Sequence, residues 1–108
     1  MALPREYRLH LQKSFDILFK FGKTHRISFG LIKYSKKVMK WPRLAIVVTK
    51  KVAKTSVARH RIKRLVGNAL DRSGFRSSIY DMMVVVQRDV SKNNFFDIEK
   101  EIVSTGLF

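Results

Sequence analysis

Residues 43–87 read RLAIVVTKKVAKTSVARHRIKRLVGNALDRSGFRSSIYDMMVVVQ, and this stretch decides the fold. The β-branched, nearly all-apolar run at 43–49 is typical of a central strand that is buried on both faces. A second apolar run at 81–87 predicts another strand. Between them, apolar residues recur at spacings of three and four, as in a helix that buries one face. A strand, a helix and a strand in succession predict a crossover between parallel neighbours.

The predicted helix begins after Thr55 or Ser56, because either side chain can accept a hydrogen bond from a first-turn N–H group. Its apolar stripe lies between residues 58 and 70 and is expected to be buried. The basic residues must then be held outward, on two flanks of the helix. Arg61, Arg64, Asn68 and Arg72 are predicted on one flank, and Arg59 and Lys63 on the other beside His60.

The rest of the chain predicts elements that cover this core. Ser14 is the expected N-cap of a short helix that Gly22 ends. Residues 26–35 alternate as a half-buried strand does, and residues 93–106 predict a final helix with Phe95, Ile98 and Ile102 facing inward. The predicted class is α/β (α+β): a single small domain over residues 1–108, with one central sheet of about four strands and helices packed on it.

The chain carries a large excess of positive charge. Its 23 Lys and Arg against 8 Asp and Glu give a formal charge of +15 on 108 residues, and the stretch 50–64 has no acidic residue. Such an excess opposes folding through self-repulsion, and it is most readily explained if a polyanion neutralises it. Nucleic acid is therefore the expected partner. A membrane is not expected, because the sequence has neither a lipidation signal nor an amphipathic helix with a broad apolar face.

The sequence offers no convincing active site of its own. Cysteine is absent, which excludes disulfides and thiolate metal sites and agrees with a cytoplasmic location. The histidines His10, His25 and His60 lack the spacing of metal ligands, and half of the acidic residues lie near the C-terminus at positions typical of a solvated surface. No catalytic residue, bound metal or bound cofactor is predicted on the protein itself.

The order ARHRIKRLVGNALDR, after a buried strand and a Lys-Lys pair, resembles the signature helix of the bacterial ribonuclease P protein family. The similarity extends over nearly the whole chain, through LPREYRL, SFDILFKFGK, PRLAIVVTKK, YDMMVVVQR and the terminal helix. Two positions depart from the family pattern. His60 stands where asparagine is usual, and Gly67 stands where a further basic residue is common.

The resemblance implies the protein subunit of a ribonucleoprotein enzyme that removes the 5′ leader from precursor tRNA. A large catalytic RNA would carry the Mg²⁺-dependent active site, and no protein partner is implied. The resemblance also implies a left-handed crossover, against the general rule. The signature helix and the loop before it would contact the catalytic RNA. The residues so implied are Lys50, Lys51, Lys54, Arg59, His60, Arg61, Lys63, Arg64 and Asn68.

A central cleft would receive the single-stranded leader. Phe15 and Phe19 match the family's cleft aromatics, and stacking on such rings holds unpaired bases of any sequence. Aromatic residues four apart on a short helix more often belong to a core, so the core and the leader-binding interpretations both stay open. Tyr34 and Lys33 are the further leader-binding candidates, one for stacking and one for a phosphate.

Two other classes of protein remain to be weighed. A ribosomal or other structural RNA-binding protein would carry the same charge without any role in cleavage. A DNA-binding helix-turn-helix protein would need a second helix close before the recognition helix, whereas a buried strand precedes the basic helix here.

Overall fold

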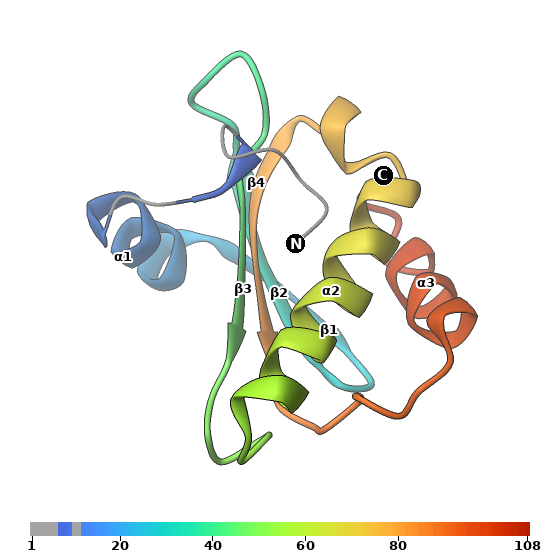
Figure 1. Ribbon diagram of the computed structural model, residues 1–108. Helices are drawn as coiled ribbons and strands as arrows, with labels where there is room; N and C mark the ends of the chain where they lie inside the picture. The colour runs from blue at the N-terminus through green and yellow to red at the C-terminus, as the bar shows by residue number, and fades with distance from the viewer. Residues whose placement is uncertain (1–6, 10–11) are drawn as a thin grey trace.

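The computed structural model of the chain describes residues 7–9 and 12–108, with the backbone alone for residues 12–15. A four-stranded mixed sheet stands between α1 on one face and α2 and α3 on the other (Figure 1). The strand order is β1-β2-β4-β3. The elements are α1 Gln12–Phe21, β1 Lys23–Ile27, β2 Gly30–Lys36, β3 Leu44–Val48, α2 Ser56–Arg72, the 3₁₀ turn η2 Phe75–Ser77, β4 Tyr80–Val86 and α3 Phe95–Val103.

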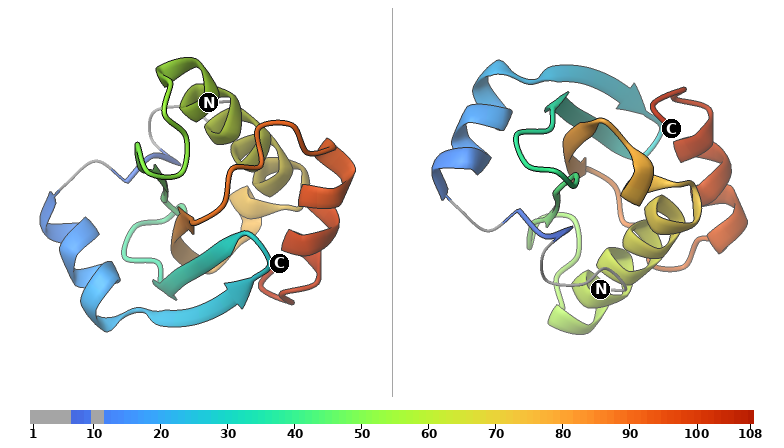
Figure 2. Two further views of the ribbon diagram at one scale, coloured as in Figure 1. Left: turned by 90° about the horizontal axis from the view of Figure 1, so that it is seen from below. Right: turned by 90° about the horizontal axis from the view of Figure 1, so that it is seen from above.

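β3, α2 and β4 form the crossover that the sequence predicts. β3 and β4 are parallel neighbours, with Leu44 opposite Met82 and Val48 opposite Val86. Seen from below, both strands run toward the reader, and the path from β3 through α2 to β4 turns clockwise (Figure 2, left). The crossover is therefore left-handed, as the resemblance implies and contrary to the general preference.

The start of α2 confirms the first of the two predicted caps. The backbone of Thr55 is extended, and its Oγ1 accepts a hydrogen bond of 3.1 Å from the backbone N–H of Ala58. Ala58 and Leu65 are half-buried, but most of the predicted apolar stripe is buried, with Ile62 and Leu70 completely covered. Each such side chain stabilises the fold by about 1.5–3 kcal/mol. Because this face of α2 is fixed against the core, the basic residues of the helix lie on the remaining circumference.

The apolar run at 43–49 forms an edge strand, so the prediction of a central strand was wrong. In β3, buried and half-buried residues alternate. The interior strands are β2 and β4. β4 pairs with β2 on one side and β3 on the other, and its residues 81–84 are all buried. The alternation of burial in β3 arises because α1 packs on β2 and β4. One face of β3 is therefore only partly covered, although its residues there are apolar.

Residues 26–35, predicted as one strand, form a hairpin instead. The chain turns at Ser28 and Phe29, so that β1 and β2 pair antiparallel with Ile27 opposite Gly30. A Cβ atom on Gly30 would lie 2.0 Å from the carbonyl oxygen of Val85, so only glycine fits where the strands meet. The apolar alternation continues through the turn, so periodicity alone did not predict that the strand is interrupted there.

The terminal helices agree with their predicted places, with one difference at the start. α1 begins at Gln12, so Ser14 lies inside its first turn and is not the N-cap. In α3, Asn94 is the N-cap and Ile98 and Ile102 are buried. Phe95 is half-buried against the core, as predicted.

A buried ion pair joins the beginnings of β3 and β4. The guanidinium Nη2 of Arg43 lies 3.3 Å from Oδ2 of Asp81, and the two side chains are 14% and 6% exposed. The backbone N–H of Arg43 also donates to Oδ1 of Asp81 at 2.8 Å. One carboxylate thus binds both the backbone and the side chain of the neighbouring strand, which fixes the parallel pair at this end.

Candidate RNA interface

A groove with a volume of about 480 Å³ opens between α2, β3 and the segment before α1. Its lining residues are Arg8, Ile46, His60, Lys63 and Arg64. None of these lining residues, all of which the structure describes, is acidic. Lys and Arg side chains around an open groove attract the phosphates of a nucleic acid strand and position it.

The groove brings together three of the residues predicted to bind the catalytic RNA. His60, Lys63 and Arg64 stand three and four residues apart, so they are neighbours on the helix surface. The prediction placed Arg64 on the other flank with Arg61, and this was wrong. Arg64 lines the groove with His60 and Lys63, because it lies one helical turn after His60.

The outer flank of α2 carries fewer available cations than the sequence suggests. Arg61 and Asn68 are exposed there. Arg72 is bound to α3, since its Nε lies 3.0 Å from Oε2 of Glu99. Its guanidinium also lies about 6 Å from the ring centres of two aromatic residues, Phe95 and Phe96. Arg72 therefore joins the two helices, whereas Arg61 points into solvent.

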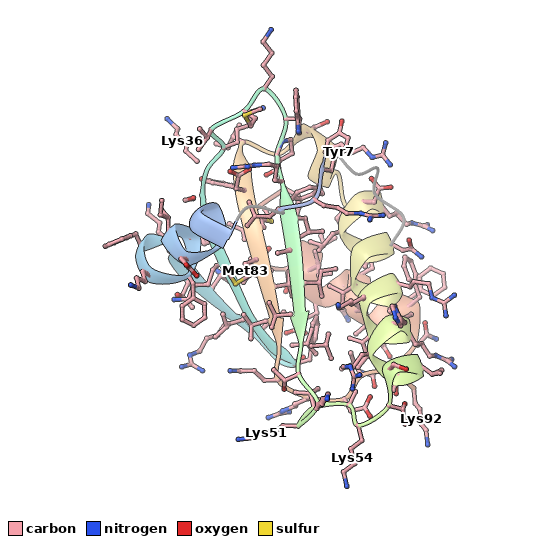
Figure 3. All side chains as sticks on the ribbon, turned by 60° about the vertical axis from the view of Figure 1, so that its left-hand side comes forward. Tyr7, Lys36, Lys51, Lys54, Met83 and Lys92 are labelled. Atoms are coloured by element: carbon pink, nitrogen blue, oxygen red, sulfur yellow. The ribbon has the colours of Figure 1, made fainter. Side chains whose placement is uncertain are left out.

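The loop between β3 and α2 presents three exposed lysines, Lys50, Lys51 and Lys54. Figure 3 shows Lys51 and Lys54 directed away from the body of the protein, at the end where β3 leads into α2. The loop backbone is tightly turned, because the carbonyl oxygen of Thr49 accepts hydrogen bonds from the N–H groups of Val52 and Ala53, both at 3.1 Å. The lysines are therefore held on a fixed backbone.

Arg59 differs from the other predicted RNA-binding residues of α2. It is half-buried, and its Nη1 donates to the carbonyl oxygens of Ala53 at 3.0 Å and Lys54 at 3.2 Å. Its guanidinium thus points back to the loop.

The face of the sheet beside α1 forms a second candidate surface. Leu31 of β2, Val47 of β3 and Val85 of β4 share this face, because cross-strand partners point to the same side. Leu18 of α1 is buried here together with Met83, while the other three remain half-buried. Sequence reasoning missed this apolar floor. The sequence offered one signal for it, which is that residues 44–48 are apolar on both faces of the strand, while the structure fully buries only one of these faces.

Phe19 and Lys33 come together at the rim of this floor. Phe19 is 51% exposed, so it is not a core residue. The ammonium group of Lys33 lies 5.4 Å from the centre of its ring. The side chain of Phe15, the other predicted aromatic, lies outside the described residues.

Tyr34 does not share a surface with Phe19 and Lys33. It follows Lys33 directly in β2, and adjacent residues of a strand point to opposite faces. Its ring packs edge-to-face on Tyr80, with ring centres 5.0 Å apart, against the core beneath α2 and α3. The predicted leader-binding residues are therefore divided between the two sides of the sheet.

Within residues 7–9 and 12–108, no three histidine or acidic side chains stand close enough together to hold a metal ion. His25 and His60 are therefore not part of such a cluster, and His10 lies outside the described residues. No helix in the described part has the length and apolar character needed to span a membrane.

Comparison with known proteins identifies relatives over the full length of the fold. The family described as Ribonuclease P matches residues 3–105. The ribonuclease P protein component of Dictyoglomus turgidum is 32% identical over 102 residues, which cover 93% of this chain and 85% of the relative. That of Streptococcus agalactiae is 29% identical over 101 residues, covering 94% and 92%.

Solved structures show the same fold. The RNase P protein of Staphylococcus aureus superposes with a TM-score of 0.78 at 19% identity, covering 92% of this chain and 91% of that one. The RNase P protein from Thermotoga maritima in complex with 1-(4-fluorophenyl)-2-thiourea gives 0.75 at 23% identity, covering 90% and 94%.

The match over residues 3–105 lends no support to the alternative of a ribosomal or other structural RNA-binding protein. This family match agrees with the resemblance that the sequence of the signature helix and the preceding lysines indicated, and with the left-handed crossover that the resemblance implied. The chain belongs to the ribonuclease P protein family, and is the accessory protein subunit of an RNA-based enzyme of tRNA 5′ processing.

Proposed function

We propose that this chain, acting as a single RNA-binding unit over residues 1–108, holds the catalytic RNA of ribonuclease P in the groove beside α2 and on the loop before it. The observation that carries the proposal is the groove, in which Arg8, His60, Lys63 and Arg64 converge without an acidic residue among them. Phosphate oxygens are the natural ligands of the three cations Arg8, Lys63 and Arg64, and an N–H group of His60 can donate a hydrogen bond to them. The proposal includes a cytoplasmic location, in line with the absence of cysteine.

The second part of the proposal is that the RNA, and not the protein, cuts the leader. Hydrolysis of a phosphodiester requires an activated water and stabilisation of charge on the leaving oxygen, which metal ions commonly supply. The described part of the chain has no cluster of ligands for a metal ion. We therefore assign Mg²⁺ to the RNA. The protein contributes cations that reduce repulsion between two RNA molecules.

The purified protein alone is expected to leave precursor tRNA uncut at any Mg²⁺ concentration, because the described residues contain no cluster of side chains that could hold a metal ion to activate water. Addition of the catalytic RNA should produce a cleaved 5′ leader, at a lower Mg²⁺ concentration than the RNA needs by itself. Both reactions are followed by gel electrophoresis of end-labelled precursor. Cleavage without RNA that follows the protein through successive columns would show this division of labour to be wrong.

The α1 side of the sheet is proposed to bind the single-stranded leader. Phe19 offers an exposed ring on which a base can stack. The ammonium group of Lys33 stands beside that ring and can meet the adjoining phosphate. Leu31, Val47 and Val85 supply an apolar floor without hydrogen-bonding groups, which suits bases of any identity. Support for this surface is the joint placement of ring, cation and floor.

Phe19→Ala is expected to leave assembly intact and to reduce the preference of the assembled enzyme for precursor over mature tRNA. One lost stacking contact is worth about 1–3 kcal/mol, or about 5- to 150-fold in relative affinity. The measurement is the binding of precursor and mature tRNA to the complex of protein and catalytic RNA.

Phe21→Ala is the matched control for this change. Phe21 lies on the same short helix and is 80% exposed, but two residues along a helix place it on the opposite flank from Phe19. It should leave the preference unchanged. Full retention of leader preference in Phe19→Ala, or an equal loss in Phe21→Ala, would remove this surface from the leader site.

A further inference from the structure

We propose that Arg59 is a positioning residue, which holds the loop before α2 so that Lys50, Lys51 and Lys54 present their charges to RNA. In this role it does not itself bind a phosphate. The inference rests on the RNA interface proposed above, and it divides the basic residues of that interface into those that touch RNA and one that acts through others.

The contacts of Arg59 are the first argument. Its Nη1 donates to the carbonyl oxygens of both Ala53 and Lys54, at 3.0 and 3.2 Å. This nitrogen carries two hydrogens, and both are used by these bonds. Nη1 therefore has no donor left for a phosphate, and its two bonds fix the direction of the whole guanidinium group, which also carries hydrogens on Nε and Nη2. The side chain is half-buried, while its neighbours Arg61 and Arg64 on the same helix are exposed.

The position of Arg59 on α2 is the second argument. A helix N-terminus carries partial positive charge, so a cation in the first turn is unfavourable there. The first turn of α2 contains no acidic residue that would compensate Arg59. Its place therefore does not stabilise the helix through the dipole. The two loop carbonyls provide the compensation, since a carbonyl oxygen is the negative end of its own dipole.

The loop geometry is the third argument. Thr49 fixes the first half of the loop by accepting bonds from Val52 and Ala53. Thr55 fixes the far end as the helix cap. Between these two anchors, Arg59 binds the carbonyls of Ala53 and Lys54. Because the backbone is held at three places, the loop loses less conformational entropy on binding RNA than a flexible loop would. The lysines therefore bind RNA more tightly.

The test compares Arg59→Met with Arg61→Met, each made in the otherwise unchanged protein and in a variant with Lys50, Lys51 and Lys54 replaced by alanine. Both arginine changes remove one charge. The measurement is the affinity for the catalytic RNA as a function of salt concentration, with the melting temperature recorded for each variant. Arg61→Met should lower the magnitude of the salt slope by about 1 in both backgrounds, as one lost phosphate contact does.

Arg59→Met should instead lower the slope by more than about 1 when the lysines are present, because several contacts are then misplaced. In the alanine background it should change neither slope nor affinity by a measurable amount, since the residues through which it acts are gone. A loss of about 1 in both backgrounds, or no loss in either, would overturn the positioning role alone. Binding by the alanine variant equal to that of the unchanged protein would instead remove the loop from the proposed interface, and the role of Arg59 with it.

A measurement on the unchanged protein covers the case in which Arg59→Met does not fold. In nuclear magnetic resonance spectra of the free protein, the Nη1 hydrogens of Arg59 should exchange with water more slowly than those of Arg61. They should also keep their chemical shifts when the catalytic RNA is added, whereas those of Arg61 should change. Equally fast exchange of the two groups before RNA is added would contradict the proposal.

Discussion

Replacement of both Lys63 and Arg64 by alanine is expected to weaken binding to the catalytic RNA by about 10²- to 10⁴-fold, since each charged contact is worth about 1.5–3 kcal/mol. Both side chains line the same groove, and neither belongs to the core. The fold should therefore survive. The magnitude of the salt slope should fall by about 2, because two phosphate contacts are lost. The measurement is a titration of labelled RNA between about 50 and 200 mM monovalent salt.

The control for this change removes two charges from another surface. Lys92 and Lys100 are exposed, and they lie before and within α3, in the part of the chain with many of the acidic residues. Their joint replacement by alanine gives the same net charge as the first variant, but it should alter binding only slightly. An equal weakening by both variants would mean that RNA responds to total charge and not to the groove.

Asp81→Asn is expected to reduce the free energy of unfolding by about 3–5 kcal/mol, because it leaves Arg43, whose side chain is only 14% exposed, without a counter-ion. The asparagine oxygen can still accept the bond from the Arg43 backbone, so the effect reports the lost charge. Denaturant unfolding in the absence of RNA measures it, since bound RNA would stabilise the folded state by mass action.

An exposed ion pair in the same chain serves as the comparison. Arg76 and Asp71 are joined by two hydrogen bonds, the shorter 2.7 Å long, yet their side chains are 44% and 28% exposed. Asp71→Asn should cost only about 0–1 kcal/mol. Replacing Asp81 and Arg43 together by leucine and methionine should recover much of the loss. If Asp81→Asn lowers the free energy of unfolding no more than Asp71→Asn does, the idea that burial makes the Arg43–Asp81 pair important for stability would be contradicted.

The crossover and its helix could be predicted because their signals are local. Thr55 caps the helix through a bond to a residue three positions away, and the apolar stripe of α2 follows from a period of 3.6. Strand order is not local. The run at 43–49 is as apolar as a central strand, but α1 covers β2 and β4 instead. The turn at Ser28 and Phe29 was also not predicted, because the alternation of apolar residues continues across it.

The candidate site could be predicted to the level of a helix face but not of single side chains. Periodicity correctly turned the basic residues of α2 outward. It could not show that Arg72 would be taken by Glu99 or Arg59 by loop carbonyls, because those partners lie outside the helix. The resemblance made both Lys33 and Tyr34 candidates for binding the leader, whereas the alternation of a strand places adjacent residues on opposite faces of the sheet.

The central position of β4 has a consequence for the order in which the protein can fold. β4 is the last strand of the chain, yet it is the strand through which β2 and β3 are joined. Until β4 has left the ribosome, β3 and α2 have no strand that joins them to the β1–β2 hairpin, and a lone hairpin or helix is marginally stable in water. The basic surface of α2 is thus made before the core that will support it. The nascent chain can therefore attract polyanions before its core has formed. The interval is lengthened because contacts between residues far apart in sequence form slowly.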